Sequence, residues 1–244
     1  IMVFKILNNV FEKKYIFKIP EPFINKINMV AYFFLVFGLV AILLAVGPAF
    51  DLFFSNLFYI GNNQFLLQST NMITIVFREI LLPVALFYIL ILPIISIKIP
   101  IKKIFFNYEF SIKGVFFIWV SLLINLIVVV NVFLKGLWGR ARPNDVLDFG
   151  GSDVFTPWHN ISNACTSNCS FVSGDAAVGF SFLALCFITK KTIYFYLAIT
   201  FGLLLGLVRI AEGGHFLSDV VFSFLITALI TVSVFYFYSR KYGK

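Results

Sequence analysis

The sequence predicts an all-α integral membrane protein with six transmembrane helices. Two observations predict this class. Hydrophobic residues make up 61% of the 244 positions and charged residues only 12%, and the mean hydropathy is +0.98, values far from those of a soluble domain. The apolar residues also form stretches about as long as a bilayer is thick, and the chain has room for roughly six of them. We therefore expect one compact membrane domain.

The expected spans follow one another with short connections. We place them at residues 28–49, 79–97, 115–134, 174–189, 193–208 and 217–238. Arg78 and Glu79 mark the start of the second span. Ser173, Gly174 and Asp175 precede the fourth span as the residues at a helix N-terminus do.

The N-terminal segment, residues 1–27, is basic. Residues 4–18 mix Lys with Phe, Ile and Leu at roughly helical spacing, which fits an amphipathic helix on the membrane surface, with a disordered basic tail as the alternative. The apolar run from Met29 to Val46 is too long for the core of a cleaved signal peptide. We therefore expect a basic segment at 1–27 and a six-helix membrane domain at 28–244.

The charges predict which side of the membrane each loop faces. With six spans, one side holds fourteen of the 19 basic residues, namely Lys5, Lys13, Lys14, Lys18, Lys26, Lys98, Lys102, Lys103, Lys113, Lys190, Lys191, Arg240, Lys241 and Lys244. The positive-inside rule makes this side, with both termini, cytoplasmic. The outer side keeps Arg78, Lys135, Arg140, Arg142 and Arg209. Most of these outer cations fall in two short segments, where a functional site is expected.

Three polar segments on the outer side carry the candidate chemistry. They are "KGLWGRARP" with Lys135 and Arg142, "FVSGDAA" with Ser173, Gly174 and Asp175, and "RIAEGGHFLSD" with Arg209, His215 and Asp219. Taken singly, such residues are ordinary packing, snorkelling or helix-capping residues. Their convergence on one membrane surface indicates a site.

The third segment predicts a nucleophile. If His215 opens the last helix, Asp219 lies one turn later on the same face and accepts a hydrogen bond from one imidazole nitrogen. The other nitrogen is then free to attack phosphorus. Passive lipid binding does not need this pair of residues, which argues against a non-catalytic protein that binds or transports anionic lipids.

The other residues predict a phosphate site. Lys135, Arg142 and Arg209 would neutralise a phosphate dianion without a metal or another cofactor. Ser173 and Gly174 are also expected in the phosphate-binding group. At Gly174 the missing side chain would let backbone N–H groups face the same anion, while Ser173 could cap the helix. We expect no metal site.

These segments resemble the signature of the type 2 phosphatidic acid phosphatases, membrane lipid phosphatases related in their site to vanadium haloperoxidases. The first part of that signature is Lys, any six residues and then Arg-Pro, and it is matched by Lys135, Arg142 and Pro143. The third part is Arg, any five residues, His, any three residues and then Asp, and it is matched by Arg209, His215 and Asp219. The resemblance implies a helical bundle with six spans, a phosphohistidine intermediate and no required metal. The chain departs from the pattern at Val208, where Ser is usual, and at Asp175, where the family has the His that protonates the leaving oxygen. We expect Asp175, held neutral beside bound phosphate, to take that role.

The residues of these segments are most similar to those of the bacterial lipid A phosphatases, especially the enzymes that remove the 4′-phosphate. This resemblance implies a multi-pass protein of the bacterial inner membrane with its site facing the periplasm. Polyprenyl pyrophosphate and phosphatidylglycerol phosphate are the alternative substrates. The expected partners are the lipid substrate and the membrane, with no nucleic acid and no obligate protein partner.

The long polar segment from Asn144 to Ser170 is expected to cover the site or recognise the headgroup. Cys165 and Cys169 could form a disulfide in an oxidising periplasm, and a zinc site with His159 is the weaker alternative. Possible headgroup contacts are Arg140, Trp158 and His159. Packing onto the membrane interface is the alternative for Trp158 and His159.

Overall fold

The computed structural model describes residue 38 and residues 47–99 and 101–242. The amphipathic segment expected at 1–27 lies outside the described residues, and so does nearly all of the span expected at 28–49. The described helices are α3 (Pro48–Asn56), α4 (Met72–Ile75), α5 (Leu82–Leu90), α6 (Leu92–Lys98), α7 (Ile112–Leu122), α8 (Lys135–Leu137), α9 (Gly174–Phe180), α10 (Phe182–Thr189), α11 (Ile193–Ala211) and α12 (Leu217–Tyr242). A short antiparallel hairpin joins β1 (Tyr59–Gly61) to β2 (Gln64–Phe65).

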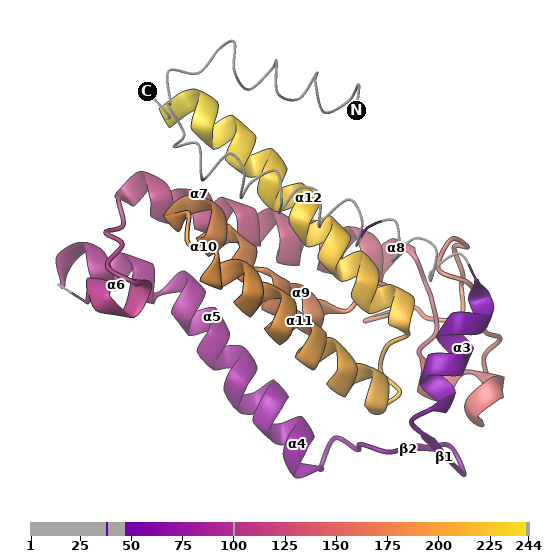
Figure 1. Cartoon of the computed structure of the whole chain (residues 1–244). Coiled ribbons are helices and arrows are strands. Elements are labelled where there is room, and N and C mark those ends of the chain that lie inside the picture. The colour runs from indigo at the N-terminus through magenta and orange to yellow at the C-terminus, as the bar shows by residue number, and fades with distance from the viewer. Residues whose placement is uncertain (1–37, 39–46, 100, 243–244) are drawn as a thin grey trace.

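The helices form a membrane bundle, as the composition predicts (Figure 1). Four helical stretches are long and apolar enough to cross a membrane, at Met72–Leu90, Ile112–Leu137, Ile193–Ala211 and Leu217–Tyr242. The apolar stretch Gly174–Thr189 is shorter and changes from α9 to α10 near Ser181. The chain is thus a multi-pass membrane protein, and the count of six spans stays a prediction.

The second span begins earlier than its hydropathy suggests. Asn71 caps the helix by accepting a hydrogen bond from the Ile73 N–H, so the helix starts at Met72 and continues through wider π-type turns at Val76–Leu81. As a result Arg78 lies within the helix, in the stretch that contacts α11.

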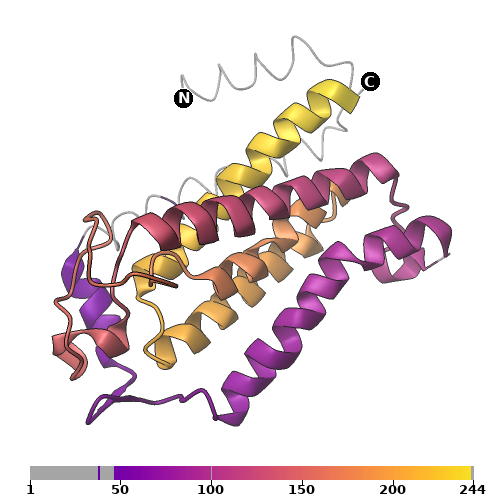
Figure 2. The same cartoon turned by 180° about the vertical axis from the view of Figure 1, so that it is seen from behind.

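The centre of the bundle is the close contact of α9 with α11, and α12 packs against both (Figures 1 and 2). Glycines allow this contact. A Cβ atom on Gly179 would lie 2.5 Å from the Gly202 Cα, so the two backbones are nearly touching. Small residues commonly bring membrane helices this close. The packing fixes the start of α9 relative to the end of α11.

The two ends of the bundle differ in character. At one end the Lys113 ammonium lies 4.8 Å from the centre of the Tyr242 ring, which joins the start of α7 to the end of α12. At the other end Arg140 and Asp51 join the start of α12 at Ser218. Figure 1 shows α3, the hairpin and the start of α12 at this second end, opposite α6 and the chain's C-terminus.

Candidate functional site

His215 lies in the short turn between α11 and α12, and only 2% of it is exposed. Its Nδ1 atom is 2.7 Å from the Ser170 carbonyl oxygen and 3.6 Å from Asp219 Oδ2. A carbonyl oxygen can only accept a hydrogen bond, so Nδ1 is the donor. In the neutral imidazole the lone pair is therefore on Nε2.

The Asp219 carboxylate is occupied by other donors. Oδ1 accepts from Arg140 at 2.7 Å, while Oδ2 accepts from Ser170 Oγ at 2.5 Å and from the Phe216 N–H at 2.8 Å. The direct hydrogen bond expected between His215 and Asp219 is thus replaced by one to the Ser170 carbonyl. The i, i+4 spacing does place the two side chains near each other, but Ser170 makes the hydrogen bonds to both of them.

The burial of His215 also sets its charge. Loss of water lowers the pKa of the imidazole to about 4, the nearby Asp219 carboxylate opposes this change, and the Arg209 charge adds to it. The imidazole is therefore neutral near pH 7. A neutral, oriented imidazole with a free Nε2 lone pair has the properties of a nucleophile.

Arg140 is placed differently from the headgroup contact that the sequence suggested. Its side chain is fully buried, and its guanidinium binds Asp51 Oδ2 at 2.8 Å, Asp219 Oδ1 at 2.7 Å, Ser218 Oγ at 2.8 Å and the Thr156 carbonyl at 2.9 Å. All three of its nitrogen atoms donate to the protein's own polar groups, and none of the side chain is exposed. Arg140 thus connects α3 to the start of α12 and supports Asp219.

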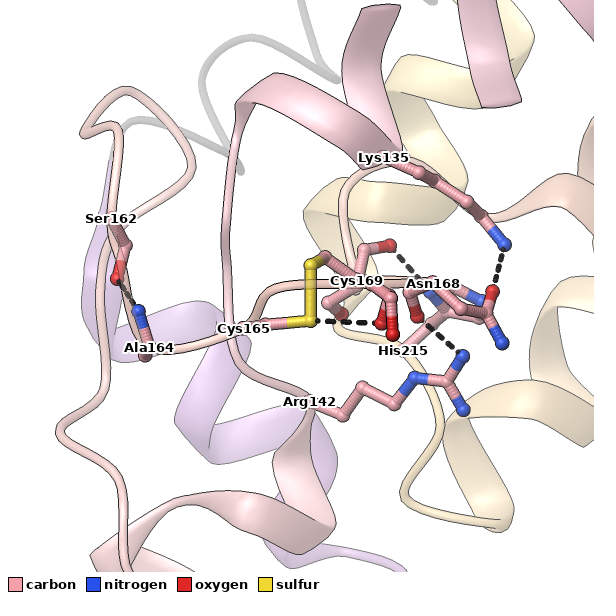
Figure 3. Close-up of a disulfide and its surroundings, with 10 residues drawn as sticks. Lys135, Arg142, Ser162, Ala164, Cys165, Asn168, Cys169 and His215 are labelled. Atoms are coloured by element: carbon pink, nitrogen blue, oxygen red, sulfur yellow. Dashed lines mark hydrogen bonds between the residues drawn. A yellow bond between two sulfur atoms is a disulfide. The ribbon is translucent and has the colours of Figure 1, made fainter. Parts of the chain in front are cut away.

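Lys135 and Arg142 come together at Asn168 (Figure 3). Lys135 Nζ donates to Asn168 Oδ1 at 2.9 Å, and an Arg142 Nη2 hydrogen donates to the Asn168 carbonyl at 2.7 Å. Figure 3 shows His215 beside this pair of contacts. Lys135 also borders Gly174, where a Cβ atom would lie 3.6 Å from its Nζ. The structure thus brings Lys135, Arg142, Gly174 and His215 to one place.

A second group of charges lies at the start of α9. Asp175 Oδ2 is 3.0 Å from Arg78 Nε and 3.6 Å from Arg209 Nε. Glu212 pairs with Arg209 and lies 3.5 Å from Arg78 Nη1. Among the described residues, the buried Nε of Arg209 has no hydrogen-bond partner. Arg209 therefore has donor capacity left for an anion.

Ser173 is the N-cap of α9. Its Oγ accepts from the Ala176 N–H at 3.5 Å, and its carbonyl accepts from Ser223 Oγ at 2.7 Å. The side chain is fully buried. Ser173 therefore fixes the start of the helix that carries Gly174 and Asp175, which is the capping role that the sequence offered for it.

The loop before Ser173 contains a disulfide between Cys165 and Cys169 (Figure 3). Paired sulfurs do not serve as thiolate ligands, so this arrangement does not provide the zinc site weighed with His159. Trp158 packs its ring against Phe222, with ring centroids 4.2 Å apart, which favours packing over headgroup contact. His159 is exposed at the edge of the Trp158 ring.

Four site residues were not singled out from the sequence as contributors: Arg78, Asn168, Ser170 and Asp51. The sequence marks Arg78 only as the start of the second span and as one of the five outer cations. Its place among those cations is the one feature of the sequence that indicates a role in the site. Asn168 and Ser170 act partly through backbone carbonyls, and a carbonyl leaves no mark on residue type. Asp51 lies just beyond an apolar stretch, where an acidic residue suggests a buried partner.

A polar cavity of about 270 Å³ adjoins the second charge group. It is lined by Ser69, Thr74, Arg78, Glu79, Leu82 and Asp175. The Thr74 hydroxyl is buried and has no hydrogen-bond partner among the described residues. The lining therefore offers hydroxyl, carboxylate and guanidinium groups next to the site.

The profile of the PAP2 superfamily matches residues 114–242. The chain is 40% identical over 164 residues to the lipid A 4′-phosphatase of Francisella tularensis subsp. novicida (strain U112), an alignment that covers 64% of this chain and 73% of that protein. It is 40% identical over 113 residues to the lipid A 4′-phosphatase of Rhizobium leguminosarum, covering 45% of this chain and 48% of that one. The Rhizobium etli protein of the same name is 38% identical over 113 residues, covering 45% and 44%.

No solved structure gives a significant match to this chain. The superfamily match spans the buried His215 and the cations gathered around it. The relatives are all phosphatases by name, and the bundle is one of apolar, membrane-crossing helices. The chain therefore belongs to the PAP2 superfamily and is a membrane lipid phosphatase.

Proposed function

We propose that this protein removes the 4′-phosphate of lipid A at the periplasmic face of the bacterial inner membrane, through a phosphohistidine intermediate on His215. The observation that carries the proposal is the geometry at His215. Its Nδ1 is engaged by the Ser170 carbonyl, its burial keeps it neutral, and Lys135 and Arg142 lie beside it. The names of the relatives supply the proposed substrate.

In the first step, the Nε2 lone pair of His215 forms a bond to phosphorus while the bond from phosphorus to the sugar oxygen breaks. Lys135, Arg142 and Arg209, whose Nε–H makes no hydrogen bond among the described residues, neutralise the charge on the phosphate oxygens. In the second step, the oxygen of water forms a bond to phosphorus while the bond from phosphorus to Nε2 breaks, and Asp175 takes up a proton from the water. Inorganic phosphate leaves, and His215 is free again. These three cations are the basis for proposing that turnover needs no metal, so prolonged treatment with a chelator should leave turnover unchanged.

Asp175 is the proposed donor of the proton to the leaving sugar oxygen. In the structure its carboxylate is held by Arg78, with Arg209 close by. The phosphate must therefore draw these arginines away, and its own negative charge then favours protonation of Asp175. Asp175→Asn should slow lipid A hydrolysis about 10²–10⁴-fold, the usual effect of losing a general acid. It should barely affect an activated aryl phosphate, and equal losses with both substrates would overturn this role.

The polar cavity beside Arg78 supports a sugar headgroup as the substrate. Hydroxyl groups of a saccharide can exchange hydrogen bonds with Ser69, Thr74 and Glu79, which line the cavity. An isoprenoid chain would leave these groups unpaired, which costs free energy. The cavity therefore favours lipid A over polyprenyl pyrophosphate.

Mass spectrometry tests the substrate. Lipid A from cells with the protein should lack the 4′-phosphate, and lipid A from cells with His215→Ala should keep it. Purified protein should release phosphate from lipid A faster than from polyprenyl pyrophosphate or phosphatidylglycerol phosphate. Unchanged lipid A together with rapid release from one of the other lipids would assign the protein to that substrate instead. No release from any lipid by a folded protein would favour non-catalytic lipid binding.

A further inference from the structure

Asn168 holds the two proposed phosphate-binding side chains of the "KGLWGRARP" segment. Its side-chain oxygen accepts from Lys135 Nζ at 2.9 Å, and its backbone carbonyl accepts from Arg142 at 2.7 Å. The backbone of Asn168 has φ of +50°, a left-handed conformation that Asn adopts more readily than most residues. One residue in an unusual conformation thus sets the separation of two cations.

Ser170, two residues later, holds the nucleophile. Its carbonyl accepts from His215 Nδ1 at 2.7 Å, and its hydroxyl donates to Asp219 Oδ2 at 2.5 Å. Its own N–H donates to the Arg140 carbonyl at 2.9 Å. Ser170 is fully buried, so these contacts are made away from solvent. The three residues 168–170 therefore touch the cations at one end and the nucleophile at the other.

The disulfide fixes the residue between them. Cys169 is 1% exposed and is bonded to Cys165, whose N–H donates to the Gly139 carbonyl at 3.0 Å. Asn168, in contrast, is exposed and lies in the loop that the disulfide closes (Figure 3). Closing a loop with a sequence separation of 4 removes little chain entropy compared with a long loop. The effect of this disulfide is therefore expected to be local rather than global.

We propose that the Cys165–Cys169 disulfide is a functional part of the active site: it holds Asn168 and Ser170 as positioning residues, so that Lys135, Arg142 and His215 are arranged for phosphoryl transfer only in the oxidised protein. This inference rests on the roles proposed above for those three residues. It does not depend on which lipid is the substrate, so an activated aryl phosphate serves as the test substrate.

The first test changes the redox state of the wild-type chain. Dithiothreitol passes two electrons and two protons to the disulfide, which leaves two cysteine thiols and the cyclic oxidised reagent. We expect kcat/KM to fall about 10- to 100-fold, the scale of a small misplacement of catalytic groups. Removal of the reagent and reoxidation should restore it.

Two cysteine variants make this test specific. The double variant Cys165→Ser/Cys169→Ser should have low activity that dithiothreitol does not change. Cys186→Ser, which removes the free cysteine within α10, should respond as the wild type does. Full activity of the wild type after mass spectrometry has confirmed both free thiols would overturn the proposal. Inactivity of the oxidised wild type toward every phosphate ester would instead overturn the proposed function.

The second test separates positioning from folding. Asn168→Gly keeps the left-handed backbone but removes the acceptor for Lys135. Asn107→Gly is the matched control, because Asn107 is also exposed and left-handed, with φ of +61°, but lies in the basic loop before α7. We expect kcat/KM to fall about 10-fold in Asn168→Gly and to stay unchanged in Asn107→Gly, with similar Tm values.

A double-mutant cycle shows whether Asn168 acts through Lys135. Binding of inorganic phosphate is measured as the rise in Tm that it causes, which needs no turnover. Asn168→Gly should weaken phosphate binding in the wild-type background and have no further effect in Lys135→Met. Equal weakening in both backgrounds, or none in either, would show that Asn168 does not position Lys135.

Discussion

At the scale of single residues, the position of Arg209 depends on a neighbour with no side chain. A Cβ atom on Gly214 would lie 2.3 Å from Arg209 Nη2 and 2.6 Å from its Cζ. Because these atoms are at the end of a long side chain, Gly214→Ala should move the guanidinium rather than the backbone. We expect kcat/KM to fall about 10²-fold with little change in Tm, measured by steady-state kinetics and thermal unfolding. An unchanged kcat/KM would remove Arg209 from the phosphate site.

His215 should make the stability of the protein depend on pH. Its pKa is about 4 in the folded protein against 6.5 in the unfolded chain, so the unfolded chain binds more protons between these values. The stability that comes from a neutral His215 is therefore complete above pH 6.5 and is lost as the pH falls toward 4. Between pH 8 and pH 5 this loss is about 2 kcal/mol, which lowers Tm by roughly 4–8 °C.

His215→Asn is the control for this pH effect, since its amide nitrogen can replace Nδ1 as the donor to Ser170 but does not titrate. The wild type should lose more Tm than this variant between pH 8 and pH 5, measured in the same detergent. Equal losses would mean that His215 is not the titrating group.

Residue types and their spacing were enough to propose His215, Arg209, Arg142 and Lys135 as candidate site residues, because charged side chains in an apolar chain stand out. They were not enough to assign the partners. The hydrogen bond that His215 was expected to donate to Asp219 is donated instead to the Ser170 carbonyl, and every residue has a carbonyl. Arg140 looked like a surface cation because its partner Asp51 lies 89 residues earlier, which no local pattern reports.

At the scale of elements, the contact between α9 and α11 sets the distance from Asp175 to Arg209. Gly179→Ala would place a methyl group 2.5 Å from the Gly202 Cα and 2.6 Å from its nitrogen. Backbone atoms cannot rotate away, so the helices must separate. We expect a loss of stability of about 1–3 kcal/mol, the usual cost of overpacking, seen as a lower Tm, together with lower activity.

Gly136→Ala is the control for this helix contact, since among the described residues no atom beyond its own neighbours and helix backbone lies within 4 Å of a Cβ atom at that position in α8. It should leave Tm unchanged or raise it slightly. If Gly179→Ala had the Tm of the wild type, the close packing of α9 on α11 would be wrong.

The start of the second span shows why hydropathy misplaces helix ends at a site. Arg78 and Glu79 are charged residues directly before an apolar stretch, so the sequence places the start of the second span there. In the structure the helix already begins at Met72 and runs through Arg78, whose partly exposed side chain pairs with Asp175 and Glu212. A paired charge costs less in a membrane helix than an isolated one, and the pair is made by residues far away in the sequence.

At the scale of the whole molecule, composition alone was sufficient to predict a helical membrane bundle, because a helix satisfies its own backbone hydrogen bonds in lipid. The count of six spans stays a prediction. The charge distribution also distinguishes the two ends of the bundle. Among the described residues, one end of the bundle carries Lys98, Lys102, Lys103, Lys113, Lys190, Lys191, Arg240 and Lys241. The proposed site lies at the opposite end, with Arg140 buried among acidic partners.

This separation predicts the sidedness of the protein in the membrane. By the positive-inside rule we expect the basic end to face the cytoplasm and the site to face outward. Ser152 and Asn107 are both exposed. Asn107 lies in the connection between α6 and α7 at the basic end, and Ser152 lies in the loop beside α3 at the other end (Figure 1). In a Cys186→Ser background, a thiol introduced by Ser152→Cys should react with an impermeant reagent in intact spheroplasts. A thiol introduced by Asn107→Cys should react only after the membrane is permeabilised. The reverse pattern would put the site in the cytoplasm, where a reducing environment would open the Cys165–Cys169 disulfide and the lipid on the outer leaflet would be out of reach.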